Sequence, residues 1–240
     1  MEDLSGQAAL ITGGSKGIGY GVAEALVRRG VNVTITARTR DDVADAAARL
    51  TKTGPGRALG LPCDVRDLSS QRNVVDQALH EYGQLDAVVA NAGIGHFGDV
   101  EQITDQQWRD VIDTNLTGVF YTVKASLEAL KASKGFLVTI ASLAGTNFFA
   151  GGAAYNASKF GLVGFTQAVM LDTRDAGVRV STIMPGSVAT HFNGNQPDAS
   201  DAWKIQPEDV GQLVVDLLRM PARTLPSKVE VRPARTKTKS

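Results

Sequence analysis

A tyrosine and a lysine four residues apart, Tyr155 and Lys159, are the side chains in this sequence best suited to chemistry. On a helix the two would lie one turn apart on the same face. A phenol ordinarily titrates near pH ~10, and a neighbouring ammonium group favours the phenolate and lowers that pKa. We therefore interpret the pair as a general acid/base. A chance pair on a solvated helix has the same spacing, so the interpretation depends on whether the chain delivers a cofactor and a substrate to the phenol.

The composition is that of a globular protein without a charge bias. The 240 residues carry 25 basic and 25 acidic side chains, and this balance gives no electrostatic footprint for nucleic acid. We expect no signal peptide and no membrane span, because the opening residues contain no basic segment followed by a long apolar run. The single cysteine, Cys63, excludes an internal disulfide and fits a reducing cytoplasm. The histidines are too scattered to predict a metal site: His80, His96 and His191.

Apolar, β-branched runs alternate with segments of helical period, which is typical of a doubly wound α/β fold with a parallel sheet covered on both faces. We expect one Rossmann-like domain over residues 1–232, with a lid at about 187–206 and a disordered basic tail at 233–240. The expected strands are 7–12, 31–36, 57–62, 85–90, 135–141, 178–184 and 228–232. The first expected helix begins in the glycine-rich turn near residue 19. Three more cover 41–52, 68–82 and 104–131. A fifth carries Tyr155 and ends at Gly177, and the last begins at Pro207.

A glycine-rich turn joins the first expected strand to the first helix. Its spacing is Gly13-x-x-x-Gly17-x-Gly19, which differs from the common dinucleotide spacing Gly-x-Gly-x-x-Gly. Such a turn lets backbone N–H groups approach a pyrophosphate at the positive end of a helix. A tight turn without a ligand is the alternative, but the strand–turn–helix context favours ligand binding. We expect the coenzyme to contact Gly13, Ser15, Lys16, Gly17, Ile18 and Gly19.

The end of the second strand indicates which coenzyme is bound. An acidic residue there would accept a hydrogen bond from the ribose 2′-hydroxyl of NAD and repel a 2′-phosphate. This chain has Arg38 at that place, and Lys16 lies in the glycine loop. Two cations at one position predict NADP(H), with two solvated surface charges as the alternative.

Seven separated motifs resemble those of the short-chain dehydrogenase/reductase family, and they occur in the same order. The resemblance covers roughly residues 4 to 232 and implies the same fold and a hydride-transfer activity. The motifs are Thr12-Gly-x-x-x-Gly-x-Gly19, Asp64-Val65, Asn91-Ala92-Gly93, Asn115, Ser142, Tyr155-x-x-x-Lys159 and Pro185-Gly186.

The resemblance implies a catalytic set of four residues. Ser142 would donate a hydrogen bond to the substrate carbonyl oxygen, and Tyr155 would protonate that oxygen. Lys159 would lower the pKa of Tyr155 and bind the nicotinamide ribose. Asn115 would bend its helix and hold a water that links Lys159 to solvent.

The resemblance also implies further coenzyme contacts. Asp64 and Val65 would contact the adenine, and residues 91–93 would line the coenzyme and hold the central strand. Thr190 would bind the carboxamide. The remaining expected contacts come from the segment after the sixth strand: Pro185, Gly186 and Val188.

These features predict an NADPH-dependent carbonyl reductase that acts on a small ketone or aldehyde. One alternative is a 3-oxoacyl-(acyl-carrier-protein) reductase, and another is a non-catalytic NADP(H)-binding sensor. The apolar helix residues predict a homotetramer, with a dimer as the smaller alternative, and they are Val111, Phe120, Val123, Phe160, Val163 and Val169. Aromatic residues near the expected site could line an apolar pocket or belong to the core: Phe97, Phe148, Phe149, Phe192 and Trp203.

Overall fold

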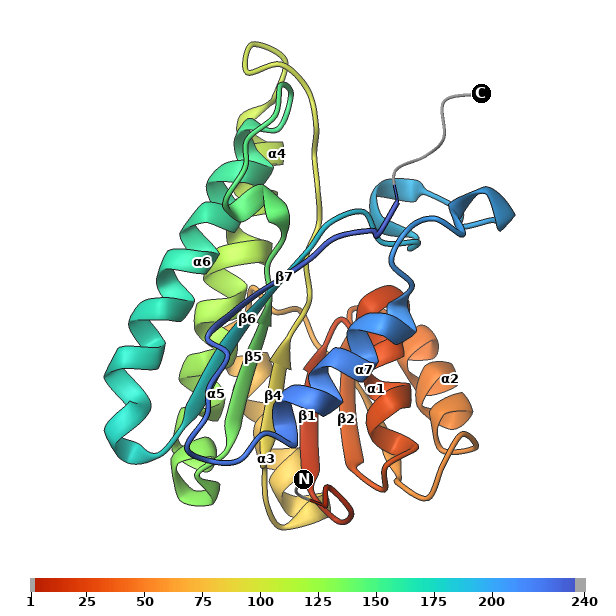
Figure 1. Ribbon diagram of the computed structural model, residues 1–240, viewed down its shortest axis with the longest axis vertical. Helices are drawn as coiled ribbons and strands as arrows, with labels where there is room; N and C mark the ends of the chain where they lie inside the picture. Colours follow the sequence, from red (N-terminus) through yellow and green to blue (C-terminus); the bar gives the residue numbers. More distant parts are fainter. Residues whose placement is uncertain (1–2, 236–240) are drawn as a thin grey trace.

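The computed structural model describes residues 3–235, and its centre is one parallel sheet with helices on both faces (Figure 1). The strands lie in the order β3-β2-β1-β4-β5-β6-β7, as a doubly wound fold requires. The chain therefore winds outward from β1 to β3, returns to the middle at β4 and winds the other way. The strands are β1 (Ala8–Thr12), β2 (Asn32–Ala37), β3 (Ala58–Pro62), β4 (Ala87–Ala90), β5 (Phe136–Ile140), β6 (Arg179–Pro185) and β7 (Lys228–Val231).

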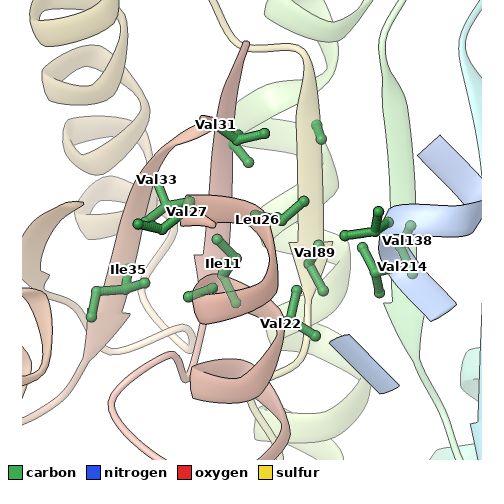
Figure 2. Close-up of a cluster of buried hydrophobic side chains, with 14 of the residues drawn as sticks. Ile11, Val22, Leu26, Val27, Val31, Val33, Ile35, Val89, Val138 and Val214 are labelled. Atoms are coloured by element: carbon green, nitrogen blue, oxygen red, sulfur yellow. The ribbon is translucent and has the colours of Figure 1, made fainter. Parts of the chain in front are cut away.

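The strands are apolar on both sides because both faces of the sheet are buried. Ile11, Val33 and Val138 point to a core layer under α1 (Gly17–Val27), α2 (Arg40–Leu50) and α7 (Pro207–Leu218), which Figure 2 shows in close-up. Their sequence neighbours Leu10 and Leu137 point to the opposite layer. That second layer is covered by α3 (Leu68–Tyr82), α5 (Gly118–Ser133) and α6 (Ala153–Thr173).

Several helix ends follow the predicted signals. Helix α3 covers the predicted residues 68–82 and ends at Gly83, whose φ of 76° lies in the left-handed region that favours glycine. Thr104 and Gln107 form the predicted capping box of α4 (Asp105–Ile112). Pro207 is the first residue of α7, as predicted.

The predicted continuous helix over 104–131 is interrupted. After α4 the chain forms a π-helical turn, Asp113–Thr117, in which the N–H group of Gly118 bonds to the carbonyl oxygen of Asp113. Helix α5 follows this turn. The cause lies in Asn115, which is fully buried and binds a neighbouring loop instead of pointing to solvent. Helical periodicity does not register one extra residue in a turn, so the periodic pattern missed it, although the family resemblance implied a bend at Asn115.

The apolar residues expected on an exposed helix surface divide into two groups. Val111, Val123 and Val169 are buried within the chain itself, so they give no support to an interface, and Val163 is half-buried. Phe120 and Phe160 remain exposed, and their rings are among the larger exposed apolar side chains of the structure.

No helix within residues 3–235 is both long enough and apolar enough to cross a membrane. Residues 236–240 of the predicted basic tail lie outside the described residues, as do residues 1 and 2.

Candidate active site

Residues from most of the predicted motifs lie at one edge of the sheet. In a parallel sheet all carboxyl ends meet at the same edge, and the crevice between β1 and β4, where the winding reverses, is the expected ligand site of such folds. The fold brings to this edge the residues that follow successive strands: Gly13, Arg38, Asp64, Asn91, Ser142 and Gly186.

The glycine loop has a backbone that other residues would strain or block. Gly13 and Gly17 have φ values of 66° and 57°. A Cβ atom on Gly19 would lie 2.4 Å from the carbonyl oxygen of Gly13, so α1 packs directly against the loop. The N-cap residue Lys16 makes no side-chain capping hydrogen bond, so the first backbone N–H groups of α1 remain available to an anion. This cradle fits the pyrophosphate of a nicotinamide dinucleotide.

Asn91 fixes the loop from the neighbouring strand. Its Nδ2 donates to the carbonyl oxygens of Thr12 and Gly13, at 2.9 and 3.1 Å. In return, the hydroxyl of Thr12 accepts from the backbone N–H groups of Asn91 and Ala92, at 3.1 and 3.2 Å. Asn91 thus acts through the backbone of the glycine loop, which agrees with its predicted role in holding the central strand.

The two cations predicted to select the coenzyme are both exposed. Lys16 precedes α1 as its N-cap residue, and Arg38 follows β2. Neither side chain forms an ion pair with another residue of 3–235, so both remain available to an anion. The local charge suits a phosphate group near the end of β2.

Asp64 is already engaged by a residue that the sequence analysis did not single out. The Arg66 guanidinium donates to both carboxylate oxygens, with Nη2 2.7 Å from Oδ2, and the Arg66 N–H donates to Oδ1 at 3.0 Å. These bonds hold the pKa of Asp64 below its ordinary value, and Arg38 adds to the effect. A carboxylate offers about four lone-pair sites and Arg66 already makes four hydrogen bonds to them, so an adenine amine would share an oxygen with Arg66. Its neighbour Val65 is buried.

Tyr155 and Ser142 meet at the end of β5. Burial raises the pKa of Tyr155 above its ordinary value, and this effect outweighs that of the nearby Ser142 hydroxyl, which favours the phenolate. The prediction of a lowered pKa is therefore wrong for the protein alone. The Nζ atom of Lys159 lies 5.7 Å from the centre of the Tyr155 ring and donates to the carbonyl oxygen of Ile140 at 3.0 Å. Burial lowers the pKa of Lys159 to about 8.

Asn115 connects the π-helical turn to the loop after β4. Its side-chain amide bonds to both backbone groups of Ile94, accepting at 2.8 Å and donating at 2.9 Å. It also donates to the hydroxyl of Ser158 at 3.1 Å, and that hydroxyl donates to the carbonyl oxygen of Tyr155 at 2.8 Å. A chain of bonds therefore runs from the turn to the helix that carries the acid. A Cβ atom on Gly93 would lie 3.2 Å from Asn115 Oδ1, so the loop approaches closely.

Two residues of this network were missed by the sequence analysis. Ser158 contributes the link just described. Asn156 is buried and donates to the carbonyl oxygens of Ala144 and Asn147, both at 2.8 Å, so it fixes the loop that follows Ser142. Both lie between Tyr155 and Lys159, and two polar residues inside an otherwise apolar helix were the available signal.

The segment predicted as a lid starts beside the glycine loop. A Cβ atom on Gly17 would lie 3.4 Å from Thr190, so the two elements are adjacent. The ends of the segment are joined by hydrogen bonds from Ala189 to Ile205 and from Ile205 to Ser187. Pro185 closes β6, and the Gly186 N–H donates to Val231 at 2.8 Å.

Within residues 3–235 no cluster of histidine, cysteine and acidic residues is arranged to hold a metal ion.

Comparisons with known proteins agree with this geometry. The sequence model described as short chain dehydrogenase matches residues 7–201. A putative ketoacyl reductase of Streptomyces coelicolor is 33% identical over 233 residues, which cover 95% of this chain and 89% of that protein. Glycine betaine reductase ATRR of Emericella nidulans is 32% identical over 240 residues, and this chain spans only 19% of its length. The alcohol dehydrogenase of Thermococcus sibiricus complexed with 5-hydroxy-NADP has a TM-score of 0.90 and 28% identity, covering 98% of this chain and 99% of that one.

Proposed function

Because the chain belongs to the short-chain dehydrogenase/reductase family of oxidoreductases, we propose that it is an NADP(H)-dependent carbonyl reductase acting on a small ketone or aldehyde. The observation that carries this proposal is that Tyr155 lies beside Ser142, with Lys159 one turn further along the same helix. That arrangement offers a hydrogen-bond donor and a proton donor to one carbonyl oxygen.

The bound coenzyme would supply the hydride that reduces the carbonyl carbon. Ser142 orients the carbonyl oxygen and stabilises the charge that develops on it. Tyr155 gives its proton to that oxygen, which leaves an alcohol and a phenolate. Lys159 stabilises the phenolate, because a nearby ammonium group favours the charged form of the phenol. The reverse reaction uses the same residues in the opposite order.

The proposed coenzyme is NADP(H), held by the glycine cradle, with its 2′-phosphate near Arg38 and Lys16. Both cations are exposed, and neither forms an ion pair within residues 3–235, which supports this choice. The complex of the Thermococcus sibiricus enzyme with an NADP derivative also supports it.

The likeness to a ketoacyl reductase favours one second candidate, reduction of a 3-oxoacyl group on acyl carrier protein. Ala176 stands before Gly177 where, by resemblance, such reductases carry a basic residue, and this difference weakens the alternative. A non-catalytic NADP(H) sensor would have no use for Ser142 beside Tyr155, so we place it third.

One assay separates these candidates. Oxidation of NADPH is followed with a mixed panel of ketones and aldehydes, with acetoacetyl-coenzyme A as the β-ketoacyl thioester, and with Tyr155→Phe as the inactive control. We expect turnover on the ketone and aldehyde panel that the control loses. Turnover on the thioester alone would favour the acyl reductase. Tight NADPH binding without turnover on any substrate would favour the sensor.

We further propose a cytoplasmic homotetramer, with a dimer as the smaller alternative. Large exposed apolar side chains on α4, α5 and α6 support an assembly, because exposed apolar surface can mark a protein interface. The residues are Trp108, Phe120, Phe160 and Leu171. Light scattering at micromolar concentration tests the assembly, with Phe120→Glu expected to shift the mass downward and Phe148→Glu as the matched control. A monomeric mass for the wild type would contradict it.

A further inference from the structure

Three phenylalanine rings from separate segments gather around the proposed acid. Phe97 lies in the loop after β4, Phe149 precedes α6, and Phe192 lies in the segment after β6; we call these three residues the aromatic wall. The Tyr155 ring centre lies 5.4 Å from that of Phe97 and 5.7 Å from that of Phe192. Phe97 also contacts Phe192 at 6.4 Å and Phe149 at 5.9 Å.

Glycines beneath the rings hold the aromatic wall in place. A Cβ atom on Gly95 would lie 2.8 Å from both the Phe97 and the Phe192 ring. A Cβ atom on Gly152 would lie 2.7 Å from the Phe149 ring. The rings therefore fill space that only glycine leaves open, and their positions are set by the backbone below them.

The wall offers apolar surface that the protein itself leaves uncovered. Phe97, which contacts the Tyr155 ring, is 43% exposed, and Phe149, which contacts Phe97, is 48% exposed. Centre-to-centre distances of 5.4 to 6.4 Å mean that the rings touch one another, so a ligand would lie against the wall and not between its rings. None of the three side chains is charged, so an ionic substituent placed there would lose hydration without gaining an ion pair.

We infer that this site selects carbonyl compounds in which an aromatic ring is attached directly to the carbonyl carbon, that is, aryl ketones and aryl aldehydes. The inference rests on the proposed carbonyl reduction. A carbonyl oxygen at Ser142 and Tyr155 places its substituent near Phe97 and Phe192, because both of these rings contact the Tyr155 ring. A flat ring gains an offset or edge contact there, and one such contact corresponds to a preference of about 2- to 12-fold over a non-aromatic group of equal area.

Three eight-carbon ketones test the inference: acetophenone, acetylcyclohexane and 2-octanone. The kcat/KM ratio of acetophenone to acetylcyclohexane is measured for the wild type, Phe97→Leu and Phe192→Leu. Comparing the ratio between proteins cancels the intrinsic reactivity of the two ketones. We expect each substitution to lower the ratio by about 3- to 10-fold. Phe148→Leu is the matched control, because Phe148 is adjacent in sequence, is 86% exposed and makes no ring contact within residues 3–235; it should leave the ratio unchanged.

A binding measurement keeps this inference separate from the proposed reaction. Tyr155→Phe retains the ring that contacts the wall but cannot deliver a proton. Calorimetry with this variant and NADPH should show tighter binding of acetophenone than of the other two ketones, and adding Phe97→Leu should remove the difference.

If the ketones are reduced but the kcat/KM ratio does not change when residues of the aromatic wall are substituted, the inference is wrong and the proposed function stands. If acetophenone is preferred in binding but the wild type reduces no carbonyl, the proposed function is wrong and the aromatic site stands. Equal binding of all three ketones would overturn the inference.

Discussion

The side-chain nitrogen of Lys159 donates a hydrogen bond to the carbonyl oxygen of Ile140, 3.0 Å away, at the end of β5. This bond is the amine's only hydrogen bond within the described residues, and burial lowers the pKa of Lys159 from 10.5 to about 8. Between pH ~8 and ~10.5 Lys159 holds its proton in the unfolded chain but not in the folded protein. The contribution of Lys159 to the free energy of unfolding therefore rises with pH through this window, by about 3 kcal/mol in total.

We predict that Lys159→Met removes this pH dependence. The variant should gain stability relative to wild type at pH ~7, where wild type carries the full desolvation cost, and lose the advantage as pH approaches ~10. Urea denaturation at a series of pH values measures the difference. Lys52→Met, which removes an exposed ammonium, is the control and should show a nearly constant difference. A constant difference for Lys159→Met as well would show that its amine titrates normally.

Tyr155→Phe should lower kcat by ~10²- to 10⁴-fold, the usual contribution of general acid catalysis. Coenzyme affinity should stay nearly unchanged, because the ring and the Lys159 amine remain. Steady-state kinetics and NADPH titration provide the two measurements. Tyr121→Phe removes a phenol hydroxyl from α5, away from Ser142, and should retain wild-type turnover. The role of Tyr155 would be ruled out if the variant kept more than about half of the wild-type kcat.

Arg38→Asp should reverse the coenzyme preference. A charge-assisted hydrogen bond from the guanidinium to a phosphate contributes ~1.5–3 kcal/mol, so wild type should favour NADPH by at least ~10-fold in kcat/KM. The new carboxylate would repel the phosphate and accept from the 2′-hydroxyl of NADH. Both coenzymes are compared at fixed low salt. Arg40→Asp makes the same charge change two residues further along the chain, and it should leave most of the preference for NADPH unchanged. A variant Arg38→Asp that still preferred NADPH would contradict the assignment.

Gly19→Ala should destabilise the protein and weaken coenzyme binding together. The added methyl group would meet the Gly13 carbonyl oxygen at 2.4 Å and Asn91 Nδ2 at 2.5 Å, so the glycine loop has to move. We expect a loss of ~1–3 kcal/mol in unfolding free energy. Gly164→Ala is the control in α6, where a Cβ atom would meet nothing within 4 Å, and it should stabilise by up to ~1 kcal/mol. Thermal denaturation with and without NADPH compares the two, and equal effects would contradict the predicted clash.

The sequence predicted the parts of this protein that depend on periodicity and local signals. Helix α3 has the predicted bounds because Asp67 caps its first turn and Gly83 ends it. The motif residues lie at one sheet edge because parallel strands require it. Contacts between distant segments were beyond the sequence pattern, and the Asn115–Ser158 hydrogen bond and the aromatic wall are examples. The direction of the Tyr155 pKa was wrong because spacing gives the distance to Lys159 but not the depth of burial.

The π-helical turn at Asp113–Thr117 fixes the phase of two helices. Each residue of an α-helix turns the chain by ~100°, so removing one residue from the turn would let α4 continue into α5 as an unbroken helix with more regular hydrogen bonds. The same deletion would rotate the buried stripe of α5 by ~100° away from the sheet, and that stripe includes Val119, Val123 and Leu130. The shortened chain would thus have more regular hydrogen bonds between α4 and α5, but α5 could no longer pack its apolar side chains against the sheet. The packing of α5 therefore fixes the number of residues in this turn, although the composition of the segment resembles that of an ordinary surface helix.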